Sequence, residues 1–353
     1  MNTIGILTSG GDSPGMNAAV WSAVKYAMQH GGIKIYGIRN GYRGLIEGEH
    51  IQLDSARVDG IHSQGGTILG SARCPAMKTP EGQAAALANI NRLGIEGMIV
   101  VGGDGSFQGA RVLSQMGVPT IGLPGTIDND LNYTDYTIGF DTACNTAMDA
   151  VMKIRDTMKS HDRIAIVEVM GRHCGDIATT VGMGMGADFI IIPELENEYP
   201  DEFNLSAMAD RILALRRQGK RFGVIITAEG VCYAKGNVRA AILREQLEEA
   251  LAQKQKAAEE KFSFDIRDMV LAHIQRGGCP TAFDRRIAIE MAARAVELLV
   301  NGTGNRVVGI TKNKIFDEDI LLALGAESKF DRGAIDMALK LSEKYIRLPE
   351  DRA

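Results

Sequence analysis

Short apolar runs that alternate with helix-like segments are the feature of this sequence that most restricts its fold. The runs have the length of buried strands, and most are separated by segments in which Ala, Leu and Met recur at helical spacing. This alternation predicts an α/β protein in which helices cover mostly parallel sheets. We expect strands at 3–8, 34–38, 97–101, 119–123, 164–169, 188–193, 222–227, 269–274 and 306–310. We expect helices at 16–29, 82–93, 106–116, 140–159, 206–217, 237–260 and 283–300.

The length of the chain favours two domains. Its 353 residues exceed the usual size of one compact domain, so two domains that share a cleft are expected. Hydrophobic residues make up 45% of the chain and charged residues 24%, a balance that excludes a largely disordered protein.

The charge of the chain and its apolar segments limit its partners and its location. A net charge of -5 and a pI near 5.8 argue against binding nucleic acid or an acidic membrane, because such proteins carry a net basic surface. No stretch approaches the ~18 apolar residues of a membrane span, and a predicted strand begins at Thr3 without a leader-like segment. The cysteines form no CxxC pair, which predicts reduced thiols. We expect a cytoplasmic protein without nucleic-acid or membrane partners.

The segment Gly102-Gly103-Asp104-Gly105-Ser106 follows one apolar strand and opens a predicted helix. Consecutive glycines let the backbone approach a phosphate closely, and a helix N-terminus presents N–H groups and a positive dipole end. Asp104 stands at the carboxyl end of the strand, where it is placed to hold Mg²⁺ directly or through water. The alternative is that Asp104 or Ser106 only caps the helix, and these five residues alone do not decide between the two.

A second acidic loop, which contains Thr126, Asp128 and Asp130, follows the next apolar strand. Phosphoryl transfer to an alcohol needs a carboxylate that orients the hydroxyl and accepts its proton. Asp128 suits that role, whereas an Asp-Asn-Asp sequence by itself is more often an exposed turn. Two such loops at neighbouring strand ends together indicate a phosphoryl-transfer site.

The first strand also ends in a glycine turn, at Gly10 and Gly11, that leads into a helix. A polyphosphate fits such a turn, and the alternative is an ordinary loop in which Asp12 or Ser13 caps the helix. The turn lacks the G-x-G-x-x-G spacing, which disfavours a dehydrogenase.

Basic residues recur at the predicted strand ends. Arginine forks suit phosphate oxygens, although each of these arginines alone is more simply an exposed or ion-paired residue. Likewise, His273 alone is more simply a partly buried histidine than a ligand. Their joint recurrence favours a binding role for Arg73, Arg163, Met170-Gly171-Arg172, Glu229, Arg267, His273 and Arg276.

Six motifs occur in order along most of the chain: TSGGDSPGMNAA, GGTILGSAR, VVGGDGS, PGTIDND, VEVMGR and HIQRGG. In this order they resemble the bacterial ATP-dependent 6-phosphofructokinases. The resemblance implies two Rossmann-like three-layer α/β/α domains with mostly parallel sheets and the active site in the cleft between them. It implies a larger ATP-binding domain of 1–138 plus 274–325, and a smaller sugar-phosphate-binding domain of 139–273 plus 326–353.

The same resemblance implies an activity and roles for single residues. The activity is transfer of the γ-phosphoryl group of ATP to the 1-hydroxyl of fructose 6-phosphate in glycolysis, in a homotetramer that shares active sites between subunits. The expected catalytic residues are Gly11, Arg73, Thr126, Asp128 as the base, and Arg172. ATP is expected at Gly11, Arg73, Cys74, Gly103, Asp104, Gly105 and Ser106, with Mg²⁺ on Asp104. Fructose 6-phosphate is expected at Thr126, Ile127, Asp128, Asp130, Met170, Gly171, Arg172, Glu229, His273 and Arg276, and at Arg163 and Arg267 from a neighbouring subunit.

Two glycines bear on the phosphoryl donor. Pyrophosphate-using relatives of this family carry an aspartate and a lysine where this sequence has Gly105 and Gly125. A carboxylate at 105 would crowd and repel an α-phosphate, and a lysine at 125 would add the charge that a short donor lacks. Both glycines therefore favour ATP.

Regulation by ADP and phosphoenolpyruvate is expected to be weakened or altered. Trp21, Ser55, Gln218 and Phe222 stand where the family's effector pocket is basic, and Asp188 stands where glutamate is usual. Part of the positive charge is kept by Lys25, Arg155, Lys220 and Arg221.

The alternatives within the enzymes are a pyrophosphate-dependent kinase or one that prefers another sugar, such as tagatose 6-phosphate. A relation to diacylglycerol or NAD kinases explains the GGDG turn but not HIQRGG. A catalytically silent nucleotide sensor is disfavoured by the presence of Asp104, Asp128 and Arg172.

Overall fold

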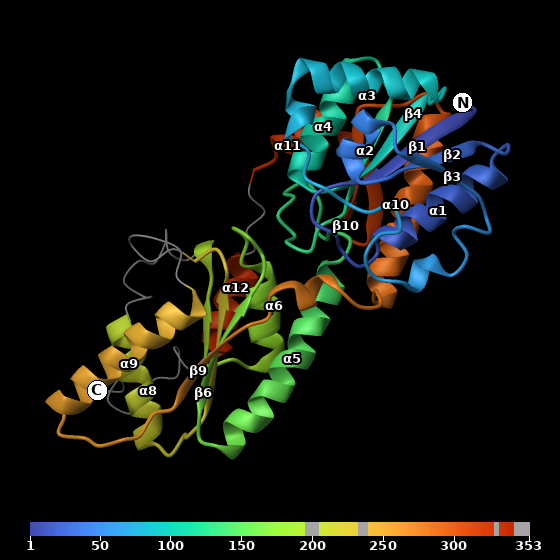
Figure 1. Ribbon diagram of the computed structural model, residues 1–353. Helices are drawn as coiled ribbons and strands as arrows, with labels where there is room; N and C mark the ends of the chain where they lie inside the picture. The colour runs from blue at the N-terminus through green and yellow to red at the C-terminus, as the bar shows by residue number, and fades with distance from the viewer. Residues whose placement is uncertain (195–204, 232–238, 328–331, 342–353) are drawn as a thin grey trace. The chain divides into compact units, whose positions relative to one another are not determined.

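The computed structural model describes residues 1–194, 205–231, 239–327 and 332–341, which form two compact units (Figure 1). The first unit comprises Met1–Ala143 and Arg276–Lys329, and the second comprises Cys144–Gln275 and Phe330–Ala353. The sequence-based divisions lie after residues 138, 273 and 325, and those of the structure lie after 143, 275 and 329.

A seven-stranded sheet forms the centre of the first unit, in the order β11-β10-β5-β4-β1-β2-β3. Its five inner strands are parallel, and the edge strands β3 and β11 run antiparallel to their neighbours. The strands are β1 (Thr3–Thr8), β2 (Lys34–Ile38), β3 (His50–Leu53), β4 (Gly97–Gly102), β5 (Thr120–Pro124), β10 (Arg306–Thr311) and β11 (Lys314–Asp319).

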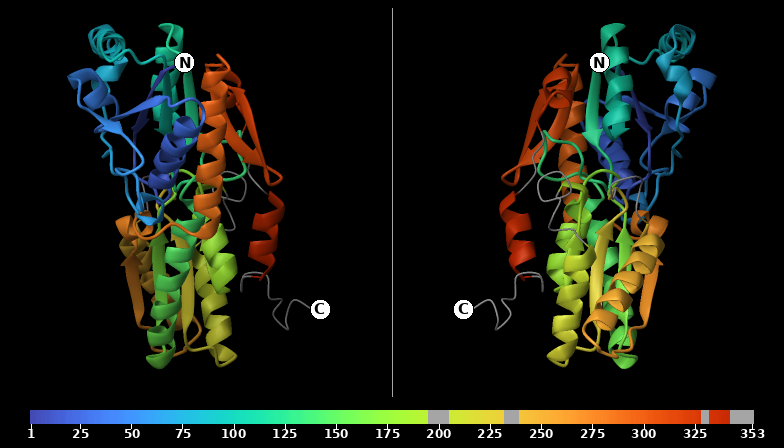
Figure 2. Two further views of the ribbon diagram at one scale, coloured as in Figure 1. Left: turned by 90° about the vertical axis from the view of Figure 1, so that its right-hand side faces the viewer. Right: turned by 90° about the vertical axis from the view of Figure 1, so that its left-hand side faces the viewer.

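Helices cover both faces of this sheet, which explains why its central strands β1, β4 and β5 are buried at every position. Along β4, Ile99 and Val101 face one hydrophobic core, whereas Met98 and Val100 face the other. The first core lies under α1 (Met16–Gln29) and α10 (Ala282–Val300), which pack together. Figure 2 shows α10 beside the β10–β11 hairpin. The second core lies under α2 (Gly41–Glu47), α3 (Pro80–Arg92), α4 (Asp104–Gln115) and α11 (Ile320–Leu324).

The order of the strands reverses between β1 and β4. The chain runs outward from β1 to β2 and β3, then returns to the other side of β1 as β4. Ligands of open parallel sheets bind outside the carboxyl ends of the strands at such a reversal. The turns after β1 and β4 therefore occupy the usual ligand position of the fold.

A parallel four-stranded sheet, in the order β7-β8-β6-β9, forms the centre of the second unit. In Figure 1, α8 and α9 lie on one side of it, and α5 and α6 lie on the other. The strands are β6 (Ile164–Val169), β7 (Phe189–Ile191), β8 (Gly223–Ala228) and β9 (Ile266–Val270). The helices are α5 (Phe140–Ser160), α6 (Asp176–Met185), α8 (Leu205–Arg217), α9 (Ala240–Ala257) and α12 (Arg332–Leu341), which packs on α6.

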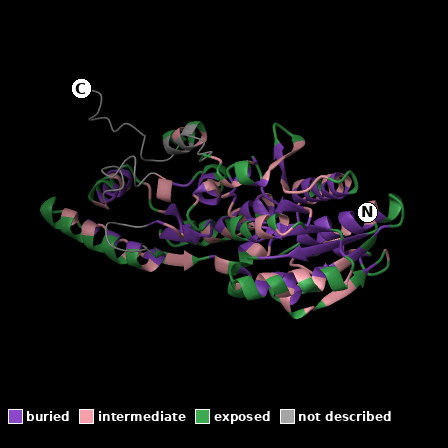
Figure 3. Ribbon diagram, turned by 90° about the horizontal axis from the view of Figure 1, so that it is seen from above, coloured by how far each residue is buried: buried purple, intermediate pink, exposed green. Residues whose placement is uncertain are grey.

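Most predicted elements are present, and the differences have local causes. The strand predicted at 269–274 is wrong: β9 covers Ile266–Val270, and a 3₁₀ turn covers Ala272–Arg276. As an edge strand, β9 is only partly buried, so it lacks a continuous apolar run (Figure 3). The edge strands β3 and β11 are polar for the same reason and were not predicted.

Helix α6 was not predicted because glycines interrupt its apolar pattern. Two further 3₁₀ turns cover Ile61–Ser63 and Pro75–Lys78.

Two further features of the chain are its cysteine thiols and the apolar length of its helices. Cys74 and Cys279 are free thiols, and Cys232 lies outside the described residues. Among the described helices, none combines the length and apolar character that crossing a membrane requires.

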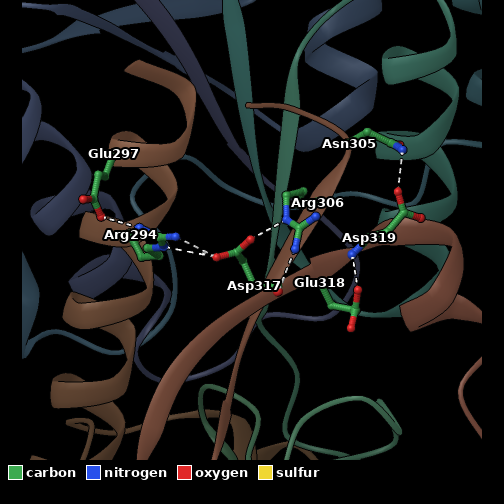
Figure 4. A network of polar contacts seen from close by, with 7 residues as sticks. All are labelled: Arg294, Glu297, Asn305, Arg306, Asp317, Glu318 and Asp319. Carbon is green, nitrogen blue, oxygen red and sulfur yellow. Dashed lines mark hydrogen bonds and ion pairs between the residues drawn. The ribbon is translucent and has the colours of Figure 1, made fainter. Parts of the chain in front are cut away.

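A network of charged side chains fastens the antiparallel edge of the first sheet to α10 (Figure 4). Asp317 of β11 accepts hydrogen bonds from Arg294 of α10 at 2.8 Å and from Arg306 of β10. Burial by itself raises the pKa of Asp317, but the two guanidinium groups outweigh it and hold that pKa below its usual range. The carboxylate is therefore ionised at neutral pH and joins three elements.

Replacing Asp317 by alanine should lower the free energy of unfolding by ~1–3 kcal/mol, because two partly buried guanidinium groups lose their shared acceptor. Urea unfolding at pH 7 measures the change. Glu318→Ala is the matched control, because the Glu318 carboxylate accepts the backbone N–H of its neighbour Asp319 and joins no other element in the described part of the chain. Equal losses in the two variants would contradict the role of Asp317.

Candidate active site

Three loops meet at the carboxyl ends of β1, β4 and β5, and glycines allow their backbones to touch. A Cβ atom on Gly102 would lie 2.6 Å from the carbonyl oxygen of Ser9 and 2.4 Å from the Ser106 hydroxyl. The N–H of Gly125 donates to the carbonyl of Gly102 at 3.0 Å. Side chains at positions 102 and 125 would force these loops apart. Glycine at both positions therefore allows the loops to lie in contact.

Helix α4 begins without a side-chain cap. Gly103, in extended conformation, precedes the helix and has no side chain, and Asp104 is the first helical residue. The alternative in which Asp104 or Ser106 caps the helix is therefore wrong. The first N–H groups of α4 remain oriented toward the end of the helix, where the dipole favours an anion. Asp104 and Gly105 are exposed beside them.

Helix α1 begins in the same way after the turn at the end of β1. Gly15, with a φ of 112°, precedes the helix, so neither Asp12 nor Ser13 caps it. The Ser71 hydroxyl donates to the carbonyl of Gly10 at 2.5 Å, which brings the segment with Arg73 and Cys74 to this turn. The cap alternative for this turn is also wrong.

Arg276 lies against the same turn. A Cβ on Gly11 would fall 2.9 Å from Nη1 of Arg276, so the guanidinium packs directly on the backbone of Gly11. Nε of Arg276 is buried without a hydrogen-bond partner in the part of the chain that the structure describes. Arg276 is expected at the sugar phosphate, and the structure places it beside Gly11, a residue expected at ATP.

The loop after β5 is a structured turn rather than an exposed one. Asn129 is buried at a φ of 55°, and its side-chain oxygen accepts the N–H of Thr137 at 3.0 Å. The Thr137 hydroxyl donates to the carbonyl of Thr126 at 2.6 Å. The N–H of Asp128 donates to the hydroxyl of Thr126 at 3.2 Å. Ile127 is buried, and Thr126, Asp128 and Asp130 are partly exposed.

Five of the predicted sugar-phosphate residues lie near the carboxyl edge of the second sheet. Met170, Gly171 and Arg172 follow β6, Glu229 follows β8, and His273 follows β9. One oxygen of Glu229 accepts the N–H groups of Gly171 at 3.3 Å and Arg172 at 2.7 Å. Arg172 has a φ of 57°, an uncommon backbone conformation for a residue with a side chain. Glu229 therefore holds the strained loop that carries Arg172.

Arg163 and Arg267 lie at the opposite, amino edge of the same sheet. Arg163 directly precedes β6, and the six residues of that strand separate it from the Met170 loop by roughly 20 Å. Both arginines bind Asp265: Nε of Arg163 lies 2.5 Å from Oδ2, and Nε of Arg267 lies 2.8 Å from Oδ1. The hydrogen bond from Arg163, then that from Arg267, lowers the pKa of Asp265.

Sequence reasoning missed Asp265, Asn129 and Gln275, which orient predicted site residues. Gln275 accepts the N–H of Met170 at 3.4 Å. It lies inside the HIQRGG motif, and this motif could have indicated its importance. Asp265 binds Arg163, which lies 102 residues away, and no local pattern indicates that pairing. Asn129 binds Thr137, only eight residues away, and stands inside the PGTIDND motif.

The described residues contain no group of three or more His, Cys, Asp or Glu side chains that could form a metal cage. Asp104 is instead a single exposed carboxylate beside an anion-binding helix N-terminus. Mg²⁺ commonly binds through one or two carboxylates plus waters and substrate phosphates. These residues fit a magnesium ion that arrives with a nucleotide.

Comparisons with known proteins identify the family of the chain. The family profile described as phosphofructokinase matches residues 3–299. ATP-dependent 6-phosphofructokinases of Alkaliphilus metalliredigens and Clostridium botulinum are 49% and 48% identical, over 97% of this chain and 100% of each relative. The Saccharomyces cerevisiae phosphofructokinase structure has a TM-score of 0.80 at 30% identity over 98% of this chain, which spans 47% of the yeast chain. A pyrophosphate-dependent phosphofructokinase of Marinobacter aquaeolei has a TM-score of 0.76 at 22% identity, over 94% of this chain and 86% of its own, and shares the fold. The chain belongs to the phosphofructokinase family.

Proposed function

We propose that this protein is an ATP-dependent 6-phosphofructokinase. It transfers the γ-phosphoryl group of ATP to the 1-hydroxyl of fructose 6-phosphate and releases fructose 1,6-bisphosphate and ADP, in the cytoplasm. The observation that carries the proposal is the uncapped N-terminus of α4, with exposed Asp104, at the sheet position next to the Asp128 loop. A helix N-terminus binds phosphate, and a nearby carboxylate can accept the proton of an alcohol.

In this proposal the first unit binds the nucleotide and carries the base. Asp104 would hold Mg²⁺, which would neutralise negative charge on the ATP phosphates. Asp128 orients the sugar hydroxyl and takes its proton, and Thr126 fixes the Asp128 backbone. The residues assigned to ATP are Gly11, Arg73, Cys74, Gly103, Asp104, Gly105 and Ser106. Arg276, packed on Gly11, adds positive charge at the same turn.

A second set of residues, which overlaps the first, binds the sugar phosphate in this proposal. Arg172 supplies a guanidinium for phosphate oxygens, and Glu229 keeps its loop in place. The residues assigned to fructose 6-phosphate are Thr126, Ile127, Asp128, Asp130, Arg163, Met170, Gly171, Arg172, Glu229, Arg267, His273 and Arg276.

A coupled assay of fructose 1,6-bisphosphate formation tests the reaction and its donor together. With saturating fructose 6-phosphate and Mg²⁺, ATP should support turnover, and pyrophosphate should support less than about 1% of that rate. Tagatose 6-phosphate in place of fructose 6-phosphate tests the acceptor. A higher rate with pyrophosphate would replace the proposed donor, and no product with either donor would refute the proposal.

The geometry at two glycines supports ATP as the donor. A Cβ on Gly105 would meet no atom within 4 Å, so this position opens into free space in front of α4. A Cβ on Gly125 would lie 2.8 Å from Val101 and 3.1 Å from Met16, so a lysine requires that the core move. Position 105 therefore has room for a side chain, whereas a side chain at position 125 would displace Val101 or Met16.

Gly105→Asp should lower kcat/KM for ATP by ~100-fold, because a carboxylate at the N-terminus of α4 repels the nucleotide phosphates. Gly105→Asn is the matched control of equal size without charge, and it should lose less than ~10-fold. Steady-state kinetics with ATP as the varied substrate measures both. Equal losses in the two variants would mean that size, rather than charge, matters at this position.

We also propose a homotetramer in which Arg163 and Arg267 serve the site of a neighbouring subunit. Support comes from their place at the amino edge of the second sheet, roughly 20 Å from the residues at its carboxyl edge. Shared sites of this kind make a subunit dependent on its neighbour.

Mixing two inactive variants tests the shared site. Asp128→Ser and Arg163→Ala should each lose turnover by ~10²-fold or more. After dissociation and reassembly at equal amounts, hybrids should recover roughly a quarter of the wild-type activity, because that share of sites pairs an intact Asp128 with an intact Arg163. A mixture without recovered activity, although hybrids form, would refute shared sites.

Control by ADP and phosphoenolpyruvate is proposed to be weakened. The ammonium of Lys220 is bonded to Asp188 in the second unit, and Lys25 is bonded to Ser55 in the first. Phe222 and Leu341 line the same pocket as Arg155 and Lys220. Strong ADP activation with sigmoidal kinetics in the coupled assay would refute this part of the proposal.

A further inference from the structure

The segment from Thr137 to Thr142 joins the Asp128 loop to the start of α5. The N–H of Ile138 donates to the carbonyl of Pro124 at 2.7 Å, so the segment continues the sheet beside β5. Thr137 makes two further bonds with the loop, through Thr126 and Asn129. The position of the Asp128 loop therefore depends on where this segment is held.

The other side of the segment packs against the turn after β1. A Cβ on Gly139, whose φ is 107°, would lie 2.6 Å from the Cβ of Ser13 and 3.1 Å from Pro14. A Cβ on Gly15 would lie 2.6 Å from a methyl group of Ile138. Because position 139 must be glycine, the residue before the first residue of α5 has no side chain that can cap the helix.

Asp284, from the first turn of α10, occupies the place of that missing cap. Its carboxylate accepts the N–H of Gly139 at 2.9 Å, the N–H of Thr142 at 2.7 Å and the hydroxyl of Thr142 at 2.5 Å. The side chain is fully buried. These bonds join positions more than 140 residues apart in sequence.

The local sequence suggests a different use for this aspartate. Thr281 and Asp284 have the spacing of a capping box, in which the acid accepts the N–H of the cap residue of its own helix. Here the N–H of Thr281 donates to the Thr142 hydroxyl at 3.0 Å, and Asp284 serves α5 instead. Thr281 still accepts the N–H of Asp284 at 3.2 Å.

The charge state of Asp284 fits this role at neutral pH. Burial raises its pKa to about 6; nearby Asp141 also raises it, and the bonds from Thr142 and Gly139 oppose the rise. At pH 7 and above the carboxylate is ionised, so both oxygens accept hydrogen bonds.

We propose that Asp284 is a positioning residue for phosphoryl transfer: it holds the segment 137–142, and through it the Asp128 loop and the turn after β1. The inference rests on the proposed function. Asp284 does not touch substrate in this account. It acts on the reaction by fixing the backbone that carries Asp128 and Gly11.

The test compares Asp284→Asn with wild-type full-length enzyme. An amide keeps the shape of the side chain but replaces one acceptor oxygen with a donor that faces an N–H group. We expect kcat to fall ~10- to 100-fold, because small displacements of a base cost that much, while KM for ATP changes less than ~3-fold. Hydrogen exchange at residues 124–142 should become faster. Thr142→Val should cause a smaller loss of kcat, and Thr142→Ser should restore it.

Asp319→Asn is the matched control. Asp319 also caps a helix of the first unit, through the N–H of Leu321 at 2.8 Å, but it lies at the amino end of β10. It should leave kcat and exchange at 124–142 unchanged. Wild-type kcat in Asp284→Asn, or unchanged exchange at 124–142, would overturn the inference whatever the thermal stability. If the wild-type enzyme forms no fructose 1,6-bisphosphate, the proposed function fails, and the exchange comparison still decides whether Asp284 holds the segment.

Discussion

The close approach of backbone loops at the carboxyl ends of β1, β4 and β5 is the constraint on which the candidate site depends. Gly102 lets the end of β4 touch Ser9, and its carbonyl receives the N–H of Gly125. Helices α1 and α4 then start from glycines, so their first N–H groups face outward without side-chain caps. The packing of the backbone therefore leaves two helix N-termini that favour an anion, and Asp104 begins α4 while Asp128 stands in the loop after β5.

The second sheet divides its charged groups between two edges. The carboxyl edge carries Arg172 on a strained loop that Glu229 holds, and the amino edge carries Arg163 and Arg267 around Asp265. Since a strand of this sheet is rigid and roughly 20 Å long, the two groups cannot bind one small phosphate in the same chain. This separation is the observation that supports the proposed sharing of sites between subunits.

Alternation of apolar runs and helical segments was sufficient to predict most of the fold. Runs such as 97–101 are apolar at every position because both faces of their strand are buried, so the strands were recognisable. Edge strands β3, β9 and β11 are half exposed and carry no such signal. The predicted start of α4, at residue 106, lies two residues after its observed start at Asp104. This error left open whether Asp104 caps the helix or is its first residue.

The candidate site residues Asp104 and Asp128 stand inside ordered motifs, whereas Asp265, which orients Arg163 and Arg267, stands outside them. Asp104 and Asp128 stand in glycine-containing turns that are recognisable from the neighbouring residues in the sequence. Asp284 and Asp265 act through partners more than 100 residues away, and in the case of Asp284 the local pattern indicates a different partner. Contacts of this kind are a property of the fold rather than of any segment.

The central claim, that the start of α4 binds the nucleotide phosphates, can be tested without following turnover. Hydrogen exchange at the backbone N–H groups of Asp104 and Gly105 should slow by ~10-fold or more when Mg²⁺ and ATP are added together, because both groups would donate to phosphate oxygens. Unchanged exchange at these positions, under conditions where the enzyme consumes ATP, would contradict the account.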